Sequence, residues 1–232
     1  MLSVFGHLFD DKIIYKLSLY ILSILYFFQI GFIFQDIGNL IGLTIVLAGI
    51  WLPTILTRII NGKIVFGIIL AANAGLLFFN IQYYFGYIIT QFFNKDMTLS
   101  SRTYIWISAL KNVAESSILG KGNPSSFGEV GWNYYNGELY VAHNQLLDIV
   151  VNGGILALSI YLIYLFIIHI RANNFIDDSI RVYFLMGIAS IGVIMLADSV
   201  SPFLPIFIMY TFVMNVKTIN EHIVDMSMTN GK

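Results

Sequence analysis

The feature that most constrains this chain is a series of apolar runs, each long enough to cross a lipid bilayer as a helix. About twenty apolar residues suffice for one crossing, and such runs recur along most of the 232 residues. The chain is 58% hydrophobic and 11% charged, whereas soluble domains carry about 25% charged residues. The sequence therefore predicts an all-α, polytopic membrane protein with about six transmembrane helices.

The predicted helices fall into two groups, on either side of a long polar stretch. Pro53 predicts a kink in the second run, and the aromatic residues that follow Phe79 are typical of the membrane interface. We place the spans at about Ile13–Phe34, Ile37–Thr57, Ile64–Phe79, Asn144–His169, Val182–Val200 and Phe203–Val216. The predicted segments are three transmembrane helices within 1–93, a large, partly helical extracytoplasmic loop at 94–143, three transmembrane helices within 144–216, and a cytoplasmic tail at 217–232.

Orientation across the membrane follows from lysine and arginine, which concentrate in cytoplasmic loops. With about six crossings, the cations of the short connections all fall on one side, which is predicted to be the cytoplasm. The groups are Lys12 with Lys16, Arg58 with Lys63, Arg171 with Arg181, and Lys217 with Lys232. The long polar loop is therefore predicted to face the periplasm or the cell exterior.

Composition and motif spacing exclude several classes of function. A net charge of −1 gives no basic field for nucleic acid, so no nucleic-acid partner is expected. The chain has no cysteine, and its histidines are not at metal-ligand spacing. The Leu-Gly-Lys-Gly sequence at 119–122 does not match the phosphate-binding loop pattern. We therefore predict neither a metal ion nor a cofactor.

The start of the polar loop predicts a helix of its own. The apolar residues Ile105, Ala109 and Val113 recur every four residues, and Ser101 before them is a suitable N-cap. Glycine and proline within 120–124 end this helix and turn the chain. The loop is therefore expected to begin as an amphipathic helix.

Four short elements follow one another across the loop and into the next apolar run. They are Arg102, Trp106, Ala109 and Leu110; Leu119, Gly120 and Gly122; Ala142, His143, Asn144 and Leu147; and Gly153 to Ile155. In this order they resemble the O-antigen ligase and O-antigen polymerase superfamily, and in particular its carboxy-terminal half. The resemblance covers about residues 99–165, within an expected domain at about 40–165.

The resemblance implies a glycosyltransferase of the bacterial inner membrane, with the fold of one half of a GT-C-like enzyme. Such enzymes take a glycan from an undecaprenyl-diphosphate carrier and join it to another lipid-linked glycan or to a lipid A core sugar. This chain is shorter than is usual in the superfamily, so a second chain that supplies further helices is one expectation. The alternative is a non-catalytic, truncated membrane protein or partner subunit that binds lipid-linked glycan.

Arg102 and His143 are the predicted catalytic residues. The guanidinium group of Arg102 can donate paired hydrogen bonds to a diphosphate, although an arginine here can also reach lipid headgroups. His143 lies at the positive end of an expected helix, which disfavours a charged imidazolium. A neutral imidazole there could take a proton from an acceptor hydroxyl. The resemblance also allows His143 to contact the diphosphate, and the sequence leaves both roles open.

Asn144 and Asp148 are predicted to bind substrate. Asn144, Asp148 and Asn152 recur every four residues, so they form one polar stripe that must face protein or a water-filled cleft. Asn144 can also cap the helix, and Asp148 can equally hold a neighbouring helix by a hydrogen bond. Asp198, near the outer end of the fifth apolar run, is a further candidate for the same cleft.

Lys121 and a pair of glycines complete the candidate residues. Lys121 is predicted to bind substrate, because its glycine-flanked turn can hold the loop and bring its ammonium group near phosphate. Gly153 and Gly154 carry no side chains, so they are predicted to permit close packing between helices.

Overall fold

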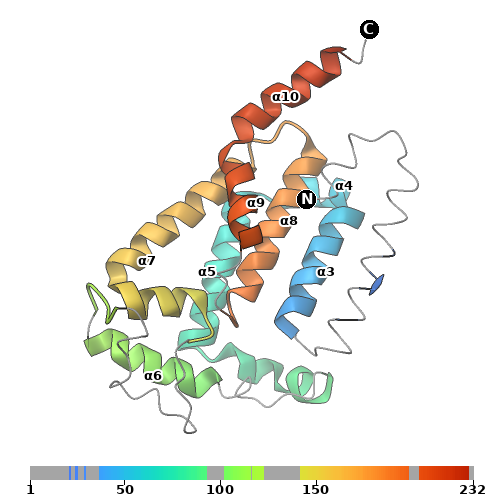
Figure 1. Ribbon diagram of the computed structural model, residues 1–232. Coiled ribbons are helices and arrows are strands. Elements are labelled where there is room, and N and C mark those ends of the chain that lie inside the picture. Colours follow the sequence, from blue (N-terminus) through green and yellow to red (C-terminus); the bar gives the residue numbers. More distant parts are fainter. Residues whose placement is uncertain are drawn as a thin grey trace. The chain divides into compact units, whose positions relative to one another are not determined.

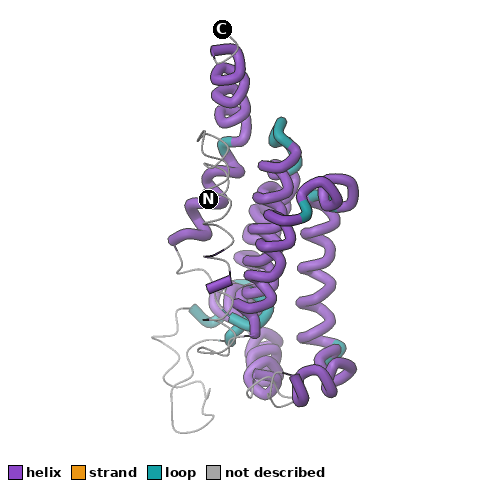
Figure 2. The backbone as a smooth tube through the Cα atoms, turned by 90° about the vertical axis from the view of Figure 1, so that its right-hand side faces the viewer, coloured by secondary structure: helices purple, strands orange, loops and turns teal. Residues whose placement is uncertain are grey.

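The computed structural model of the protein describes residues 37–92, 102–115, 117–122, 142–198 and 204–229, with a few positions before residue 37. These residues form helices and turns and no strand, which confirms the predicted all-α class (Figure 1 and Figure 2). The chain divides into two compact units. Unit 1 contains Met1–Gly67, Phe166–Ile191 and Phe203–Lys232, and unit 2 contains Ile68–Leu165 and Gly192–Pro202.

The helices are labelled as in Figure 1, and three of them continue from one unit into the other. Their bounds are α3 Ile37–Trp51, α4 Pro53–Ile59, α5 Gly62–Phe78, α6 Arg102–Glu115, α7 Gln145–Ala172, α8 Asp178–Ile194, α9 Leu204–Met214 and α10 Val216–Thr229. A 3-10 helix, η3, occupies Ile81–Phe85, and a π-helical turn, η4, occupies Ile88–Phe92.

Among the described residues, α7 is the one helix that is long and apolar enough to cross a bilayer by itself. The helix α5 is apolar but shorter, and α3 and α4 meet the same criterion only as a pair. The first expected span, Ile13–Phe34, falls almost entirely outside the described residues. The number of six transmembrane helices therefore stays a prediction.

The second expected span, Ile37–Thr57, is not one continuous helix. The axes of α3 and α4 differ by 102°, far more than the kink predicted at Pro53. Proline has no amide hydrogen to continue the helix, and its ring disfavours the helical conformation at the residue before it. Leu52 accordingly has φ −122° and ψ 36°. The chain therefore turns sharply between the two helices.

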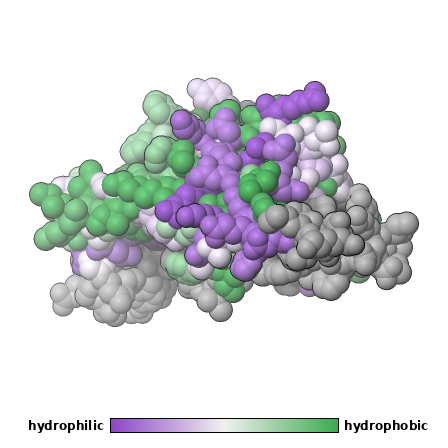
Figure 3. Space-filling model, turned by 90° about the horizontal axis from the view of Figure 1, so that it is seen from above, coloured by the Kyte–Doolittle hydropathy of each residue, from purple (hydrophilic) through white to green (hydrophobic). Residues whose placement is uncertain are grey.

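Unit 1 gathers three of the predicted groups of cations. Arg181 of α8 donates to the carbonyl oxygen of Thr57 in α4, and Arg171 of α7 donates to that of Met214 in α9. Lys217 follows directly in α10, which occupies most of the segment predicted as a polar tail. Figure 3, which views the molecule from the side of α10 in Figure 1, shows hydrophilic side chains gathered in the middle of this face.

Unit 2 is built around a core between α6 and the first part of α7. The run that begins at Ile64 ends its helix at Phe78, and Asn80 in the left-handed conformation (φ 49°) turns the chain into η3. The predicted amphipathic helix is present as α6, although Ser101 itself lies outside the described residues. Its buried face meets the start of α7 in a cluster of Ile105, Trp106, Ala109, Ala142, Leu147, Val150 and Val151.

Candidate functional site

Trp106 connects α6 to the chain just before α7. Its side chain is 2% exposed, and its indole Nε1 donates a hydrogen bond of 3.0 Å to the carbonyl oxygen of Ala142. Ala142 is itself buried in the same cluster, together with Ala109 and Leu147. The apolar residues of the first and third sequence elements therefore belong to one core, whereas Leu119 and Ile155 are exposed. That core holds the residue preceding His143 against α6.

Arg102 begins α6, one helical turn before Trp106 and on the same side of the helix. Its side chain is partly exposed, and no carboxylate in the described part of the chain forms an ion pair with it. Arg102 therefore lies at the end of α6 that is nearer to the contact between Trp106 and Ala142, and Ala142 directly precedes His143. An arginine in such a position can meet an anionic ligand.

His143 has a left-handed backbone conformation, with φ 51°. This conformation is uncommon for residues other than glycine, and it persists only where surrounding contacts enforce it. The imidazole Nδ1 lies 3.5 Å from Oδ1 of Asp198, and the His143 side chain is 34% exposed. That separation is longer than a good hydrogen bond, but it brings the two groups together. Asp198, which was a further candidate for the predicted cleft, therefore lies beside His143.

Asn144 caps α7 and is completely buried. Its Oδ1 accepts the amide hydrogen of Leu147 at 3.0 Å, as predicted for an N-cap. Its Nδ2 donates to Oδ1 of Asn73 in α5 at 3.0 Å and to the carbonyl oxygen of Leu196 at 3.1 Å. The amide of Gln145 donates to the carbonyl oxygen of Met195. The start of α7 is thus bonded both to α5 and to the turn that follows α8.

Asp148 lies one turn further along α7 and supports the same corner. Its Oδ1 accepts the amide hydrogen of Ala142 at 2.5 Å. This hydrogen bond lies within the protein, but it reaches the segment just before α7 and not a neighbouring helix. Asn144 and Asp148 therefore act on both sides of His143, since they fix the residues that precede and follow it.

The helix α7 breaks at Gly154, which has φ 69° and ψ −172°. Such a break removes the helical hydrogen bonds from residues 155 and 156 to residues 151 and 152. Segment 117–122 replaces each lost partner. The amides of Lys121 and Gly122 donate to the carbonyl oxygens of 151 and 152, and the amides of 155 and 156 donate to those of 117 and 118. The backbone at the break is therefore satisfied by segment 117–122.

The two glycines at this contact have no room for side chains. A Cβ on Gly120 would lie 2.5 Å from the backbone of Asn152 and Gly154, and a Cβ on Gly154 would overlap Ile118. Gly120 also has a positive φ of 72°. Gly153 and Gly154 were predicted to allow close packing between helices. For Gly154 this prediction was wrong, because Gly154 packs against segment 117–122 and breaks its own helix.

Lys121 lies away from Arg102. Its Nζ donates a 2.7 Å hydrogen bond to Oδ1 of Asn112, and its backbone is held beside Val151. Asn112 is ten residues after Arg102 in α6, which corresponds to about 15 Å along the helix. The structure therefore brings together His143, Asn144, Asp148 and Asp198 at the end of α6 that begins with Arg102, and leaves Lys121 at the opposite end.

Sequence reasoning missed the buried amide side chains of Asn73, Asn112 and Gln82. Asn73 binds Asn144, Asn112 binds Lys121, and Gln82 approaches Thr103, the neighbour of Arg102, at 3.5 Å. Asn73 lies in a strongly apolar run, and a polar residue in such a run usually has a partner. That signal could have singled out Asn73, but nothing in the sequence names its partner.

The cap residue allows a test of the polar contacts around α7. Replacing Asn144 with alanine should lower the free energy of unfolding by about 2–3 kcal/mol, because a cap is lost and buried partners lose hydrogen bonds. Asn144→Ser keeps a capping oxygen but loses the amide donors, so its loss should be smaller by about 1 kcal/mol. Equilibrium unfolding in mixed micelles measures both. Equal losses would show that the cap contributes nothing.

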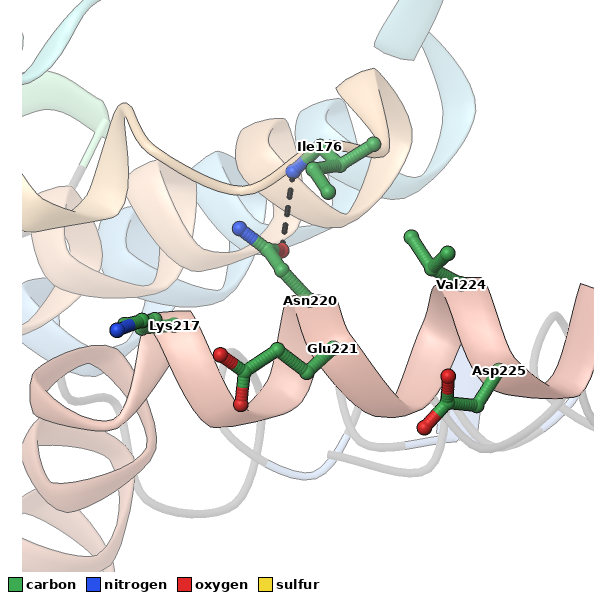
Figure 4. Close-up of a pocket in the computed structure, with 6 residues that line it drawn as sticks. All are labelled: Ile176, Lys217, Asn220, Glu221, Val224 and Asp225. Atoms are coloured by element: carbon green, nitrogen blue, oxygen red, sulfur yellow. Dashed lines mark hydrogen bonds between the residues drawn. The ribbon is translucent and has the colours of Figure 1, made fainter.

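A separate pocket of about 490 Å³, largely open to the surface, lies in unit 1 beside α10. Figure 4 shows Asn220 of α10 reaching toward the backbone of Ile176, whose amide donates to the Asn220 Oδ1. The charged residues Lys217, Glu221 and Asp225 also line it. It contains none of the predicted site residues, and we assign it no part in the chemistry.

Comparison with known proteins gives one family. The model of the O-antigen ligase family matches residues 37–162, which is more than half of the 232-residue chain. Neither a curated protein nor a solved structure matches the chain. Proteins of this family are integral inner-membrane proteins of lipopolysaccharide biosynthesis, in keeping with the apolar helix α7. The matched region contains Arg102 and His143, and the chain belongs to the O-antigen ligase family.

Proposed function

We propose that this chain is a membrane glycosyltransferase that moves a glycan from an undecaprenyl-diphosphate carrier to an acceptor hydroxyl. The acceptor is either another lipid-linked glycan or a lipid A core sugar. The observation that carries the proposal is the hydrogen bond from Trp106 to Ala142, which joins the helix beginning at Arg102 to the residue before His143. This bond supports a site that uses both the cation of Arg102 and the imidazole of His143.

Arg102 has the chemistry required to hold the donor. Its guanidinium group can donate two parallel hydrogen bonds to phosphate oxygens, which a lysine cannot do in the same geometry. Negative charge grows on the carrier diphosphate as the glycosidic bond breaks. A fixed cation at that position stabilises the departing diphosphate more than the bound donor, and so lowers the barrier.

His143 has the chemistry required to activate the acceptor. Its Nε2 would take the proton of the acceptor hydroxyl while the hydroxyl oxygen bonds to the anomeric carbon and the diphosphate leaves with the bonding electrons. Asp198, near Nδ1, would hold the imidazole with its proton on Nδ1 and would stabilise the imidazolium that forms. We assign Asp198 the role of a positioning residue.

We assign Asn144 and Asp148 the role of positioning residues, which hold His143 in place. Both make hydrogen bonds within the protein that fix the neighbours of His143. Lys121, about 15 Å from Arg102 along α6, is assigned to the bound glycan or acceptor and not to the donor diphosphate. Arg102 would therefore bind the diphosphate at the bond that breaks, and Lys121 would bind the substrate further from it.

The test is glycan display in a bacterial strain that lacks its own ligase or polymerase. The full chain should restore long-chain glycan, and the acceptor that carries it identifies the reaction. Arg102→Lys keeps the charge but loses the paired hydrogen bonds, so we expect at least about a tenfold loss of product, which corresponds to about 1.4 kcal/mol. Lys111→Ala, which removes an exposed cation from the same helix, is the matched control.

Two outcomes would count against the proposal. If the chain is inserted and stable but restores no glycan, it does not act alone, and the role of a partner subunit gains support. If Arg102→Lys and Lys111→Ala both give wild-type amounts of product, Arg102 does not bind the diphosphate. Protein levels in the membrane fraction must be equal for either comparison.

A further inference from the structure

We infer that α4 lies in the membrane interface and that Arg58 and Lys63 beside it bind the headgroups of anionic phospholipids. This inference concerns unit 1 and is independent of the proposed transfer reaction. Because α4 is bent by 102° from the apolar helix α3, α4 runs close to the membrane plane wherever α3 runs across it.

The residues of α4 suit the boundary between lipid tails and headgroups. None of the residues of this fully described helix is buried by protein. Ile55 and Ile59, one turn apart, are 56% and 62% exposed, and the exposed Arg58 lies on a neighbouring part of the helix surface, three residues after Ile55. A short interfacial helix of this kind places its apolar side chains among the acyl chains, while a long cationic side chain extends from it to the headgroups.

Trp51 and Leu52 extend the apolar surface at the bend. They are 46% and 47% exposed. Tryptophan is enriched at the membrane interface because its ring is apolar and its N–H group is polar. Trp51 at the bend is therefore a side chain typical of the membrane interface.

The protein fixes α4 in this direction by contacts from two other helices. Arg181 of α8 donates to the carbonyl oxygen of Thr57 at 3.3 Å and pairs with Asp178 at 2.7 Å. The amide of Gly62 donates to Oδ1 of Asn173 at 2.8 Å. A side chain on Gly62 would overlap the carbonyl of His169. The turn after α4 is thus held tightly against the end of α7.

The positive charges beside α4 indicate which lipid headgroups would bind there. Arg181 has a carboxylate partner, but Arg58 and Lys63 are exposed, and no carboxylate in the described residues pairs with them. Both belong to the cations predicted to face the cytoplasm, where the membrane surface is negative. Anionic headgroups would supply the missing counter-charges.

The first experiment measures the depth of α4 with nitroxide labels. The chain contains no cysteine, so single cysteines at Ile55 and Ile59 can be labelled in the full chain without other changes. We expect the two labels to lie at the same depth in lipid nanodiscs. Labels at Leu156 and Ile160 of α7 are the matched pair, because four residues along a spanning helix change depth by about 6 Å.

The second experiment measures the lipid next to α4. A fluorophore on a cysteine at Ile59 is quenched by doxyl-labelled phosphatidylglycerol or by doxyl-labelled phosphatidylcholine at equal content. We expect stronger quenching by phosphatidylglycerol. Arg58→Gln and Lys63→Gln should each reduce the local preference about fivefold, whereas Lys111→Gln in α6 should not change it.

Three results would overturn the inference. A depth difference of about 6 Å between the labels at Ile55 and Ile59 would place α4 along a crossing path or in a re-entrant loop. Equal quenching by the two lipids in the wild-type background would exclude an anionic preference. Labels that neither lipid quenches would show that a protein surface, such as a second copy of the chain, covers α4.

Discussion

Replacing His143 with asparagine is expected to lower the turnover of glycan transfer about 10²- to 10⁴-fold, the contribution usually made by a general base. Asparagine tolerates the left-handed backbone that His143 adopts at φ 51°, so the fold around Asn144 should be kept. The amide cannot take the proton of the acceptor hydroxyl. The donor concentration needed for half-maximal rate should therefore change little.

The measurement is the rate of transfer by the full chain in nanodiscs, with an undecaprenyl-diphosphate-linked glycan as donor. Asp198→Asn is the companion variant. Asp198 lies 3.5 Å from Nδ1 of His143 and does not reach the acceptor in the proposed reaction, so its loss should be smaller. Because the role of Asp198 depends on the imidazole, adding Asp198→Asn to His143→Asn should cause little further loss. Losses that multiply would show that the two residues act separately.

The opposite pattern would assign His143 a different role. If His143→Asn mainly raises the donor concentration needed for half-maximal rate, the imidazole binds the diphosphate and does not remove the proton. That role was left open by the sequence. If turnover and donor affinity are both unchanged, His143 takes no part in the reaction.

Local features of unit 2 were predictable from the sequence. The four-residue recurrence of Ile105, Ala109 and Val113 predicted α6, and the position of Asn144 predicted its capping of α7. Both depend on residues within one or two helical turns, and the same short-range logic predicted the all-α class. Arg102 and His143 were identified as candidates from the chemistry of their side chains and from their place in sequence elements that resemble the superfamily. Their catalytic roles remain predictions.

Long-range contacts were not predictable from the sequence. Asn73 and Asn144 are far apart in the chain, and no periodic pattern indicates that their amides meet. The sequence also grouped Lys121 with the other site residues, whereas its ammonium group contacts Asn112, about 15 Å from Arg102 along α6. The break in α7 at Gly154 was hidden for a similar reason. Its missing hydrogen bonds are supplied by segment 117–122, which precedes it by more than thirty residues.

Replacing Gly154 with alanine is expected to destabilise the protein by about 3–5 kcal/mol. A residue with a Cβ loses about 1–3 kcal/mol at this φ and ψ, which only glycine adopts readily. The new methyl group would also overlap Ile118. Segment 117–122 must then move, which weakens four backbone hydrogen bonds, each contributing about 1 kcal/mol. Equilibrium unfolding of the full chain in mixed micelles measures the loss.

Gly67→Ala is the matched control, because a Cβ at Gly67 meets nothing within 4 Å. Gly67 lies within α5, where alanine is favoured over glycine by about 1 kcal/mol. This variant should therefore be as stable as the wild type or more stable. If Gly154→Ala unfolds at the same denaturant concentration as Gly67→Ala, the break at Gly154 does not contribute to the stability of unit 2.

A double-mutant cycle with Gly120 tests the contact itself. Gly120 has a positive φ, and a Cβ there would lie 2.5 Å from the amide nitrogen of Gly154. If each substitution separately pushes segment 117–122 away from α7, the second should cost less once the first is present. The double variant is therefore expected to be less destabilised than the sum of the single losses. Additive losses would mean that the two glycines serve only their own backbone conformations, and that segment 117–122 does not act as the partner of the broken helix.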